Sequence, residues 1–424
     1  MNRSTEALSG QLGSTPAGGA SPRSAHISRR TALRLGLGAV AAVGVGPTVV
    51  GCTDSQGNGG GGGGKGAAQG KEVVPPRFWR HLTDVGCWIE STPAVVGGVL
   101  YIGTGGPAFV YALDAATGTQ RWSFTPESAI YSSPAVAEGL VYIGSTDENL
   151  YALDAATGTQ RWAFHAGTPV NTSPAVVDGV VYFGSSGDIH TRGGAYAVDA
   201  ATGAQKWAYP IGGIDGSSPA VVDGCVYFGA GDGNLYALDA ATGTKKWAFP
   251  TGGIISSSPA VVDGCVYFGS GDKNLYALDA ATGTKKWSHS TGGVVRSSPA
   301  VAQGTVYVGS GDMNVYAVDA ATGAEKWTFA TGNWVGGRPT VVNGVVYIGS
   351  ADSNLYALDA ATGTKKWAFT TSGTVKSAPA VVDGVVYIGS DGGYVYALDA
   401  ATGTTGPESP PSPSPSDARS AVKA

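Results

Sequence analysis

The twelve-residue stretch YALDAATGTKKW occupies Tyr236–Trp247 and returns without change at Tyr276–Trp287 and Tyr356–Trp367. Edited copies raise the number to eight, and their first tyrosines fall at positions 111, 151, 196, 236, 276, 316, 356 and 396. The spacing is 40 residues, except for one of 45. A fixed period of this length predicts a repeat architecture in which each unit is one supersecondary element.

Each unit is expected to contain four short strands. In the fifth unit, an apolar run at Cys265–Gly269 lies between turn residues at Asp263-Gly264 and Asp272–Asn274, and a third turn follows at Asp279–Gly283. Tight turns that bound short runs of Val, Tyr and Phe are typical of antiparallel strands. The predicted fold class is therefore all-β.

The two ends of the repeat region complement each other. The eighth unit stops at Thr405 without reaching its Trp, whereas Phe78-Trp79-Arg80-His81 precedes the first unit. We therefore expect the N-terminal segment to supply the outer strand of the last unit. This predicts a closed eight-bladed β-propeller of four-stranded antiparallel blades over residues 77–405, in place of an open solenoid, because closure removes exposed strand edges.

One tryptophan recurs at the same place in every blade. We expect each indole to pack between neighbouring blades, where it would be a large contributor to stability. These structural tryptophans are Trp79, Trp122, Trp162, Trp207, Trp247, Trp287, Trp327 and Trp367.

The pattern Ala-x-Asp-x-x-Thr-Gly-x-x-x-Trp, preceded by Val-Tyr-x-Gly-Ser and Leu-Tyr-Ala-Leu, resembles the repeat of PQQ-like, or quinoprotein-type, β-propellers. That family includes pyrroloquinoline-quinone (PQQ) dehydrogenases, an outer-membrane assembly scaffold and sensor domains, so the resemblance specifies a fold more than a function. In the dehydrogenases it implies adjacent cysteines over the cofactor and an axial calcium. This chain has no Cys-Cys pair, and only Glu90, Asn171 and nearby Asp215 could bind calcium. We predict no cofactor, with PQQ and calcium as the alternative.

Residues 28–52 resemble a bacterial twin-arginine signal joined to a lipobox. Arg29 and Arg30 form the arginine pair, and Cys52 would carry the lipid. We predict an export signal at 1–51, a glycine-rich linker at 52–76 and a disordered Pro/Ser-rich tail at 406–424. The protein would then be anchored to the outer face of the bacterial cytoplasmic membrane through its lipid alone. General export and an uncleaved membrane-anchor helix remain alternatives.

Charge and motifs narrow the functional classes. The formal charge is −5, and residues 1–51 carry +4, which leaves −9 on the remainder. This balance argues against a nucleic-acid partner. The sequence contains neither G-x-S-x-G nor H-E-x-x-H, so a hydrolase is disfavoured. Cys225 and Cys265 stand where other repeats have Val, Leu or Thr, and we expect both to be small buried hydrophobes.

Positions that vary among near-identical repeats are free of the demands of the fold. The variation is greatest three residues before each strand-opening proline, at Glu90, Tyr131, Asn171, Gly216, Ser256, Arg296, Gly336 and Lys376. Further departures are Trp88, Trp334, Arg338 and a lengthened loop with His190 and Arg192. We predict a recognition face there, for an envelope or extracellular protein or a small ligand; drift on a tolerant surface is the alternative. The predicted function is a non-catalytic binding scaffold, with a PQQ-dependent dehydrogenase as the alternative.

Overall fold

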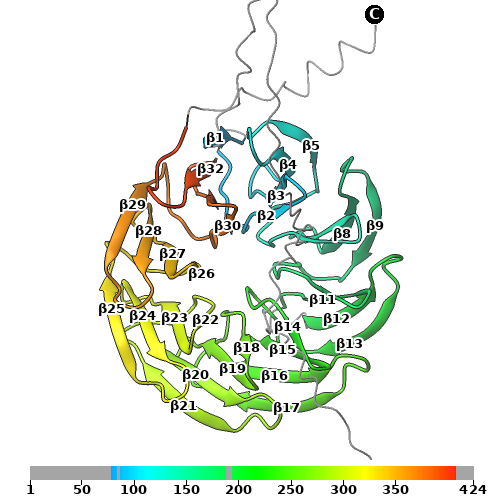
Figure 1. The fold of residues 1–424 in the computed structure, drawn as a ribbon. Helices are drawn as coiled ribbons and strands as arrows, with labels where there is room; N and C mark the ends of the chain where they lie inside the picture. The colour runs from blue at the N-terminus through cyan, green and yellow to red at the C-terminus, as the bar shows by residue number, and fades with distance from the viewer. Residues whose placement is uncertain (1–77, 84–85, 188–192, 407–424) are drawn as a thin grey trace, which may run out of the picture. The chain divides into compact units, whose positions relative to one another are not determined.

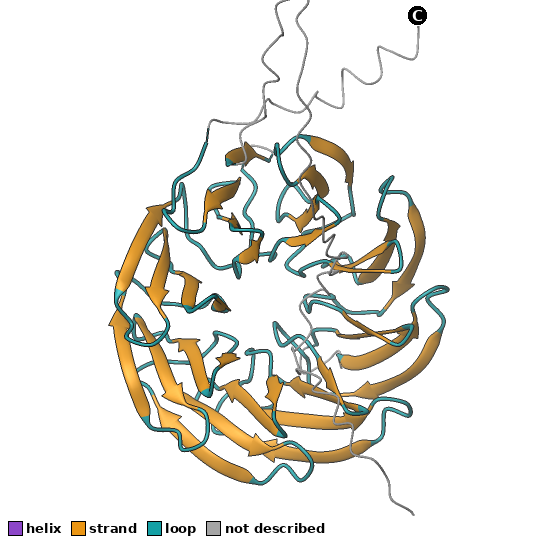
Figure 2. Ribbon diagram, in the orientation of Figure 1, coloured by secondary structure: helices purple, strands orange, loops and turns teal. Residues whose placement is uncertain are grey.

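A computed structural model describes residues 78–83, 86–187 and 193–406. Five predicted functional residues, Arg29, Arg30, Cys52, His190 and Arg192, lie outside these ranges, as do the export signal and the linker. The described residues form 32 strands (Figure 2). Within them, no helix has the length and apolar character needed to cross a bilayer.

The strands form eight four-stranded sheets, which are the blades. The inner strands are β2 (Ala94–Val96), β6 (Ala135–Ala137), β10 (Ala175–Val177), β14 (Ala220–Val222), β18 (Ala260–Val262), β22 (Ala300–Ala302), β26 (Thr340–Val342) and β30 (Ala380–Val382). The second strands are β3 (Val99–Gly103), β7 (Leu140–Gly144), β11 (Val180–Gly184), β15 (Cys225–Gly229), β19 (Cys265–Gly269), β23 (Thr305–Gly309), β27 (Val345–Gly349) and β31 (Val385–Gly389). The third strands are β4 (Val110–Asp114), β8 (Asn149–Asp154), β12 (Gly194–Asp199), β16 (Asn234–Asp239), β20 (Asn274–Asp279), β24 (Asn314–Asp319), β28 (Asn354–Asp359) and β32 (Tyr394–Asp399). The outer strands are β5 (Gln120–Phe124), β9 (Gln160–His165), β13 (Gln205–Pro210), β17 (Lys245–Pro250), β21 (Lys285–Ser290), β25 (Glu325–Ala330), β29 (Lys365–Thr370) and β1 (Trp79–Leu82).

The blades follow one another around a ring, numbered 1 to 8 from β2–β5 to β30–β32 (Figure 1). The outer strand of blade 8 is β1, which pairs antiparallel with β32 in the register Trp79↔Ala397 to Leu82↔Tyr394. The inner strands of blades 1 and 8, β2 and β30, are also in contact. The predicted all-β, eight-bladed propeller and its closure by the N-terminal strand are confirmed.

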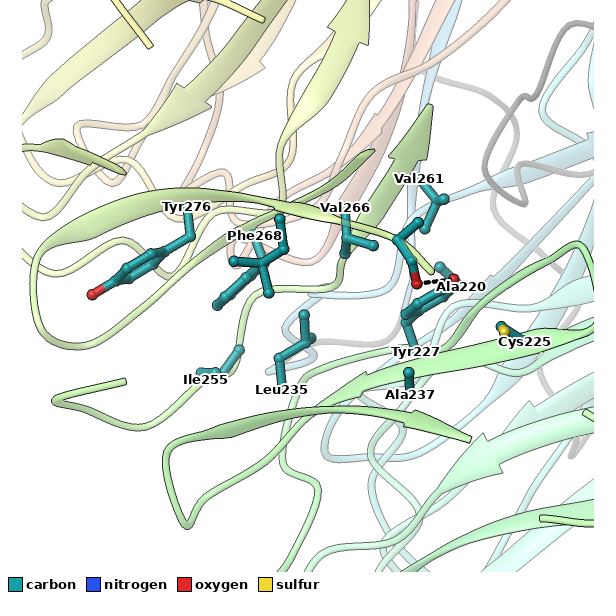
Figure 3. Packing of buried hydrophobic residues seen from close by; sticks show 12 residues of the cluster. Ala220, Cys225, Tyr227, Leu235, Ala237, Ile255, Val261, Val266, Phe268 and Tyr276 are labelled. Atoms are coloured by element: carbon teal, nitrogen blue, oxygen red, sulfur yellow. Dashed lines mark hydrogen bonds between the residues drawn. The ribbon is translucent and has the colours of Figure 1, made fainter. Parts of the chain in front are cut away.

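The core lies between adjacent blades. Between blades 4 and 5, the side chains of Leu235, Val266 and Phe268 are fully buried and interdigitate across the two sheets (Figure 3). The second and third strands are buried on both faces because each sheet is covered on two sides. This double coverage explains why their sequences read as continuous apolar runs.

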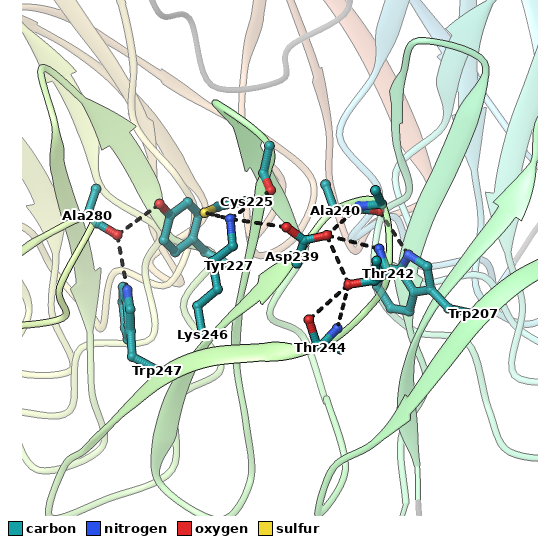
Figure 4. Close-up of polar contacts among 12 residues, drawn as sticks. Trp207, Cys225, Tyr227, Asp239, Ala240, Thr242, Thr244, Lys246, Trp247 and Ala280 are labelled. Atoms are coloured by element: carbon teal, nitrogen blue, oxygen red, sulfur yellow. Dashed lines mark hydrogen bonds and ion pairs between the residues drawn. The ribbon is translucent and has the colours of Figure 1, made fainter.

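The tryptophan that recurs in each repeat joins its blade to the next one. The Trp247 Nε1–H donates to the Ala280 carbonyl oxygen at 3.1 Å, and that carbonyl also accepts the Tyr227 hydroxyl at 3.1 Å (Figure 4). Gly283 has a φ of +73°, and a Cβ there would lie 2.7 Å from the Trp247 ring. Glycine is therefore required both by the turn and by the indole. The equivalent indole bonds are Trp79–Ala115, Trp122–Ala155, Trp162–Ala200, Trp207–Ala240, Trp287–Ala320, Trp327–Ala360 and Trp367–Ala400.

The remaining letters of the repeat build the turn before the outer strand. Asp239 Oδ1 accepts hydrogen bonds from the Ala241 and Thr242 backbone N–H groups, at 3.1 and 3.0 Å, and from the Thr242 hydroxyl at 3.0 Å. Such side-chain bonds to the local backbone define an Asx-type turn. The recurrence of Asp-Ala-Ala-Thr-Gly thus has a structural cause in every blade.

Candidate functional site

Two sets of loops share one face of the ring. One set joins each outer strand to the next inner strand, and the other joins second and third strands. Backbone hydrogen bonds connect the two sets, such as Gly271 N–H to Ile254 O and Gly311 N–H to Val294 O, both 2.8 Å. We call this surface the crossover face. The positions that vary most among the repeats lie on it.

A belt of hydroxyl groups links neighbouring blades at the start of the inner strands. At six of the eight positions, the backbone N–H donates to the hydroxyl of the equivalent residue in the next blade, as in Ser258 N–H to Ser298 Oγ at 2.9 Å. The six links are Thr92–Ser133, Ser133–Ser173, Ser173–Ser218, Ser218–Ser258, Ser258–Ser298 and, across the closure, Ala378–Thr92. Arg338 and Ala378 have no hydroxyl, so the belt lacks its links from blade 6 to 7 and from blade 7 to 8.

The seam between blades 8 and 1 holds an ion-pair cluster. Lys376 Nζ lies 2.7 Å from Glu90 Oε1 and 2.9 Å from Asp391 Oδ2, and Asp391 also accepts the Thr374 hydroxyl. Burial alone would lower the pKa of Lys376, but the hydrogen bonds to both carboxylates raise it above its usual value. Two of the predicted recognition residues, Glu90 and Lys376, are therefore brought together and satisfy each other.

A second polar contact crosses blades 3 and 4. Asn171 Nδ2 donates to Asp215 Oδ1 and to Ser186 Oγ, both at 3.1 Å. Asn171 Oδ1 is buried without a partner among the described residues. Tyr131, in blade 2, is half-buried and makes no hydrogen bond within the described part of the chain.

Blades 4 to 6 contribute to one open pocket of about 360 Å³ on the crossover face. Its lining includes Asp215, Gly216, Ile254, Ser256 and Arg296. Three successive predicted ring positions, Gly216, Ser256 and Arg296, are thus neighbours around the axis, as an arrangement at the start of the inner strands requires.

The two off-pattern tryptophans have different environments. Trp88 is half-buried, and its indole lies against Gly105, where a Cβ would clash with the ring, and close to Gly106. Trp334 covers the backbone of Gly336 but keeps 37% of its surface exposed. Trp88 therefore packs within blade 1, whereas Trp334 remains available to a partner.

Exposed apolar side chains and basic side chains without an ion pair occur on the crossover-face loops of blades 5 to 7. Ile254, Met313 and Trp334 are 51%, 48% and 37% exposed. Lys273, Arg296 and Arg338 form no ion pair with any described residue. Arg338 is half-buried, and desolvation lowers the pKa of its guanidinium below the usual value. We call these six residues the crossover patch.

The structure does not bring the three candidate calcium ligands together. Of the three candidate calcium ligands, Glu90 already binds the Lys376 ammonium, and that cation opposes a second one at the same carboxylate. Asn171 and Asp215 contact each other in other blades. Among the described residues, no three His, Cys, Asp or Glu side chains are grouped to hold a metal.

Comparison with known proteins agrees with the fold. The family model described as outer membrane protein assembly factor BamB matches residues 74–219, 191–299 and 289–416. The structure of BamB from Moraxella catarrhalis superimposes with a TM-score of 0.64 at 21% identity, covering 74% of this chain and 99% of that one. Quinohemoprotein alcohol dehydrogenase from Comamonas testosteroni gives 0.66 at 19% identity, covering 78% and 77%.

A further match is to a quinohemoprotein alcohol dehydrogenase of Pseudomonas putida, 36% identical over 83 residues. This segment is 17% of the present chain and 11% of that enzyme. The repeat motif, the closed ring and the family match over most of the chain agree. The chain therefore belongs to the PQQ-repeat propeller family described as outer membrane protein assembly factor BamB.

Proposed function

We propose that this protein is a non-catalytic scaffold of the bacterial cell envelope that binds another protein through its crossover face. The crossover patch is the observation that carries the proposal. Membership in a family described by an outer-membrane assembly factor supports the same class of function.

The patch has the chemistry of a protein-binding surface. Tryptophan and arginine are enriched among residues that dominate binding energy, and Trp334 and Arg338 lie four residues apart in one loop. Ile254 and Arg296 line the same pocket, which adds an apolar wall beside a cation. Since three cations here have no acidic partner within the described residues, the complementary ligand is an acidic segment with apolar side chains.

A pulldown from envelope extracts tests this proposal with matched variants. The test variant changes Arg296, Trp334 and Arg338 to Ser. The control variant changes Lys245, Lys285 and Lys365 to Ser; these residues are exposed at the start of outer strands, at the opposite face of the ring. We expect the test variant alone to lose its partners and their recovery to fall with added salt. Equal recovery by both variants would exclude the patch as the binding surface.

We also propose that the chain is exported and lipid-anchored through Cys52. The signal resemblance at residues 28–52 and the envelope association of the family support this. A Cys52→Ser variant should lose metabolic labelling with palmitate and leave the membrane fraction, whereas Arg29→Lys with Arg30→Lys should retain the unprocessed form inside the cell. Labelling that persists without Cys52 would refute the anchor.

A quinoprotein dehydrogenase is the second candidate, favoured by the 36% identity over 83 residues. Incubation of the purified chain with PQQ and calcium distinguishes it from the scaffold. A stoichiometric complex with dye-linked alcohol oxidation would support the enzyme. No change in absorbance or melting temperature would support the scaffold.

A further inference from the structure

Blades 4 and 5 each place a thiol beside a lysine ammonium. Cys225 and Cys265 open the second strands β15 and β19. Lys246 Nζ lies 3.1 Å from Cys225 Sγ (Figure 4), and Lys286 Nζ lies 3.0 Å from Cys265 Sγ. The expectation that both cysteines are buried hydrophobes was incomplete: Cys225 is buried and Cys265 half-buried, but each sulfur contacts a cation.

The outer strand and its turn hold each ammonium in place. Lys246 pairs with Asp239 at 3.3 Å and donates to the Gly224 carbonyl at 3.3 Å, and Lys286 pairs with Asp279 at 3.7 Å. The hydrogen bond to the cysteine is the first cause that raises the pKa of Lys246 and of Lys286. Both lysine side chains remain exposed enough to exchange protons with water, at 36% and 40%.

The same chain contains two internal comparisons. In blade 6, Lys326 Nζ makes the equivalent contact with the Thr305 hydroxyl at 2.8 Å, so the lysine is in place without a thiol. Cys87, in contrast, is buried, and its thiol donates to the Pro107 carbonyl at 3.3 Å. A cation beside a sulfur stabilises the negative charge that the sulfur carries when it reacts as a nucleophile, and the Pro107 carbonyl beside Cys87 supplies no such charge.

We propose that Cys225 and Cys265 are oxidation sites for hydroperoxides, with hydrogen peroxide as the simplest substrate. The thiolate sulfur attacks one peroxide oxygen and forms an S–O bond while the O–O bond breaks. The sulfur loses two electrons and becomes sulfenic acid. The departing hydroxide takes a proton from the neighbouring lysine ammonium and leaves as water, and the lysine regains its proton from solvent.

The test is a timed exposure of the full chain to hydrogen peroxide at pH 7, followed by dimedone, which traps sulfenic acid. Trypsin then releases Cys225 in peptide 207–245 and Cys265 in peptide 247–273, which differ in sequence. We expect both to be labelled before the peptide containing Cys87. In the Lys246→Gln variant, labelling of Cys225 should slow about tenfold while that of Cys265 is unchanged.

Two further variants separate charge from folding. Lys246→Arg keeps the positive charge and should restore most of the rate, and Lys326→Gln removes a lysine that contacts no thiol and should leave both rates unchanged. Melting temperatures identify any variant that loses structure. Equal labelling rates of Cys225 in Lys246→Gln and in the unaltered chain would overturn the proposal.

Discussion

Replacing Trp79 with Ala is the sharpest perturbation of the ring closure. The indole is only 1% exposed, and its Nε1–H donates to the Ala115 carbonyl of blade 1 at 3.0 Å. Its ring lies 6.1 Å from that of Tyr387. The strand that carries it, β1, has four residues, and among the described strands it pairs only with β32. The change therefore removes the main anchor of the closing strand.

The magnitude follows from burial and hydrogen bonding. Truncation of a buried aromatic side chain costs about 3 to 5 kcal/mol of unfolding free energy. The Ala115 carbonyl keeps its bond from the Tyr387 hydroxyl at 3.0 Å, so it is not left unsatisfied. The lost indole bond therefore contributes only about 1 kcal/mol. Trp79→Phe should cost nearer that lower figure, because it keeps most of the apolar contact.

Urea unfolding combined with hydrogen exchange measures both the size and the place of the effect. Trp287→Ala is the matched control: that indole is 8% exposed and makes the same bond, to Ala320, but β21 belongs to a continuous hairpin with β20. Both variants should lose stability, and only Trp79→Ala should lose exchange protection in β1 and β32 before the other blades. Loss of less than about 0.5 kcal/mol, or unchanged protection in β1, would refute this account of closure.

Three further outcomes follow from the crossover face and its loops. Lys376→Met leaves Glu90 and Asp391 half-buried without their cation, and we expect a loss of about 1 to 3 kcal/mol in urea unfolding, larger than that of Glu90→Gln; equal losses would contradict the shared role of Lys376. Burial raises the pKa of Asp272, but bonds from the Tyr276 hydroxyl and the Gly252 N–H outweigh it, so the folded pKa lies below its usual value, as it does for Asp312 and Asp352. This stabilisation is present above the unfolded pKa of about 3.9 and is lost as pH falls through the folded pKa values. The melting temperature should therefore stay level from about pH 7 to 5 and drop below about pH 4. A level profile down to pH 3 would show that these carboxylates do not contribute to stability. Arg338→Ser restores a hydroxyl to the belt and should stabilise the ring by about 1 kcal/mol while weakening partner recovery, whereas Arg338→Ala should weaken recovery without the gain in stability.

The architecture could be predicted from the sequence because the repeat period, the turn residues and the apolar runs between them define the strands of each blade. The absent last tryptophan and the extra Trp79 segment identified the closing strand without coordinates. Pairings across blades could not be predicted in the same way. Glu90 and Lys376 are 286 residues apart, and only a closed ring of the correct size brings them within 2.7 Å. The contact of Cys225 with Lys246 depends on how the second and outer strands of the blade lie relative to each other. The same two residue types recur at the same spacing as Cys265 and Lys286, but the spacing alone does not predict a contact.

Arg338 departs from the repeat pattern at a position where the other blades, except blade 8, have a hydroxyl group. At the link from blade 7 to blade 8, Ala378 also lacks a hydroxyl, but Thr340, the only threonine among the first residues of the inner strands, bonds to the Pro379 carbonyl at 2.6 Å. The link from blade 6 to blade 7 has no such substitute. The Ser297 hydroxyl does bond to the Gly337 carbonyl there, but Ser217 and Ser257 make the same bond in blades where the belt is intact, so this bond does not replace the missing one. Arg338 thus gives up a belt hydrogen bond that is replaced at the next link, and its guanidinium forms no ion pair with the described residues; this combination supports our proposal that Arg338 contacts a binding partner.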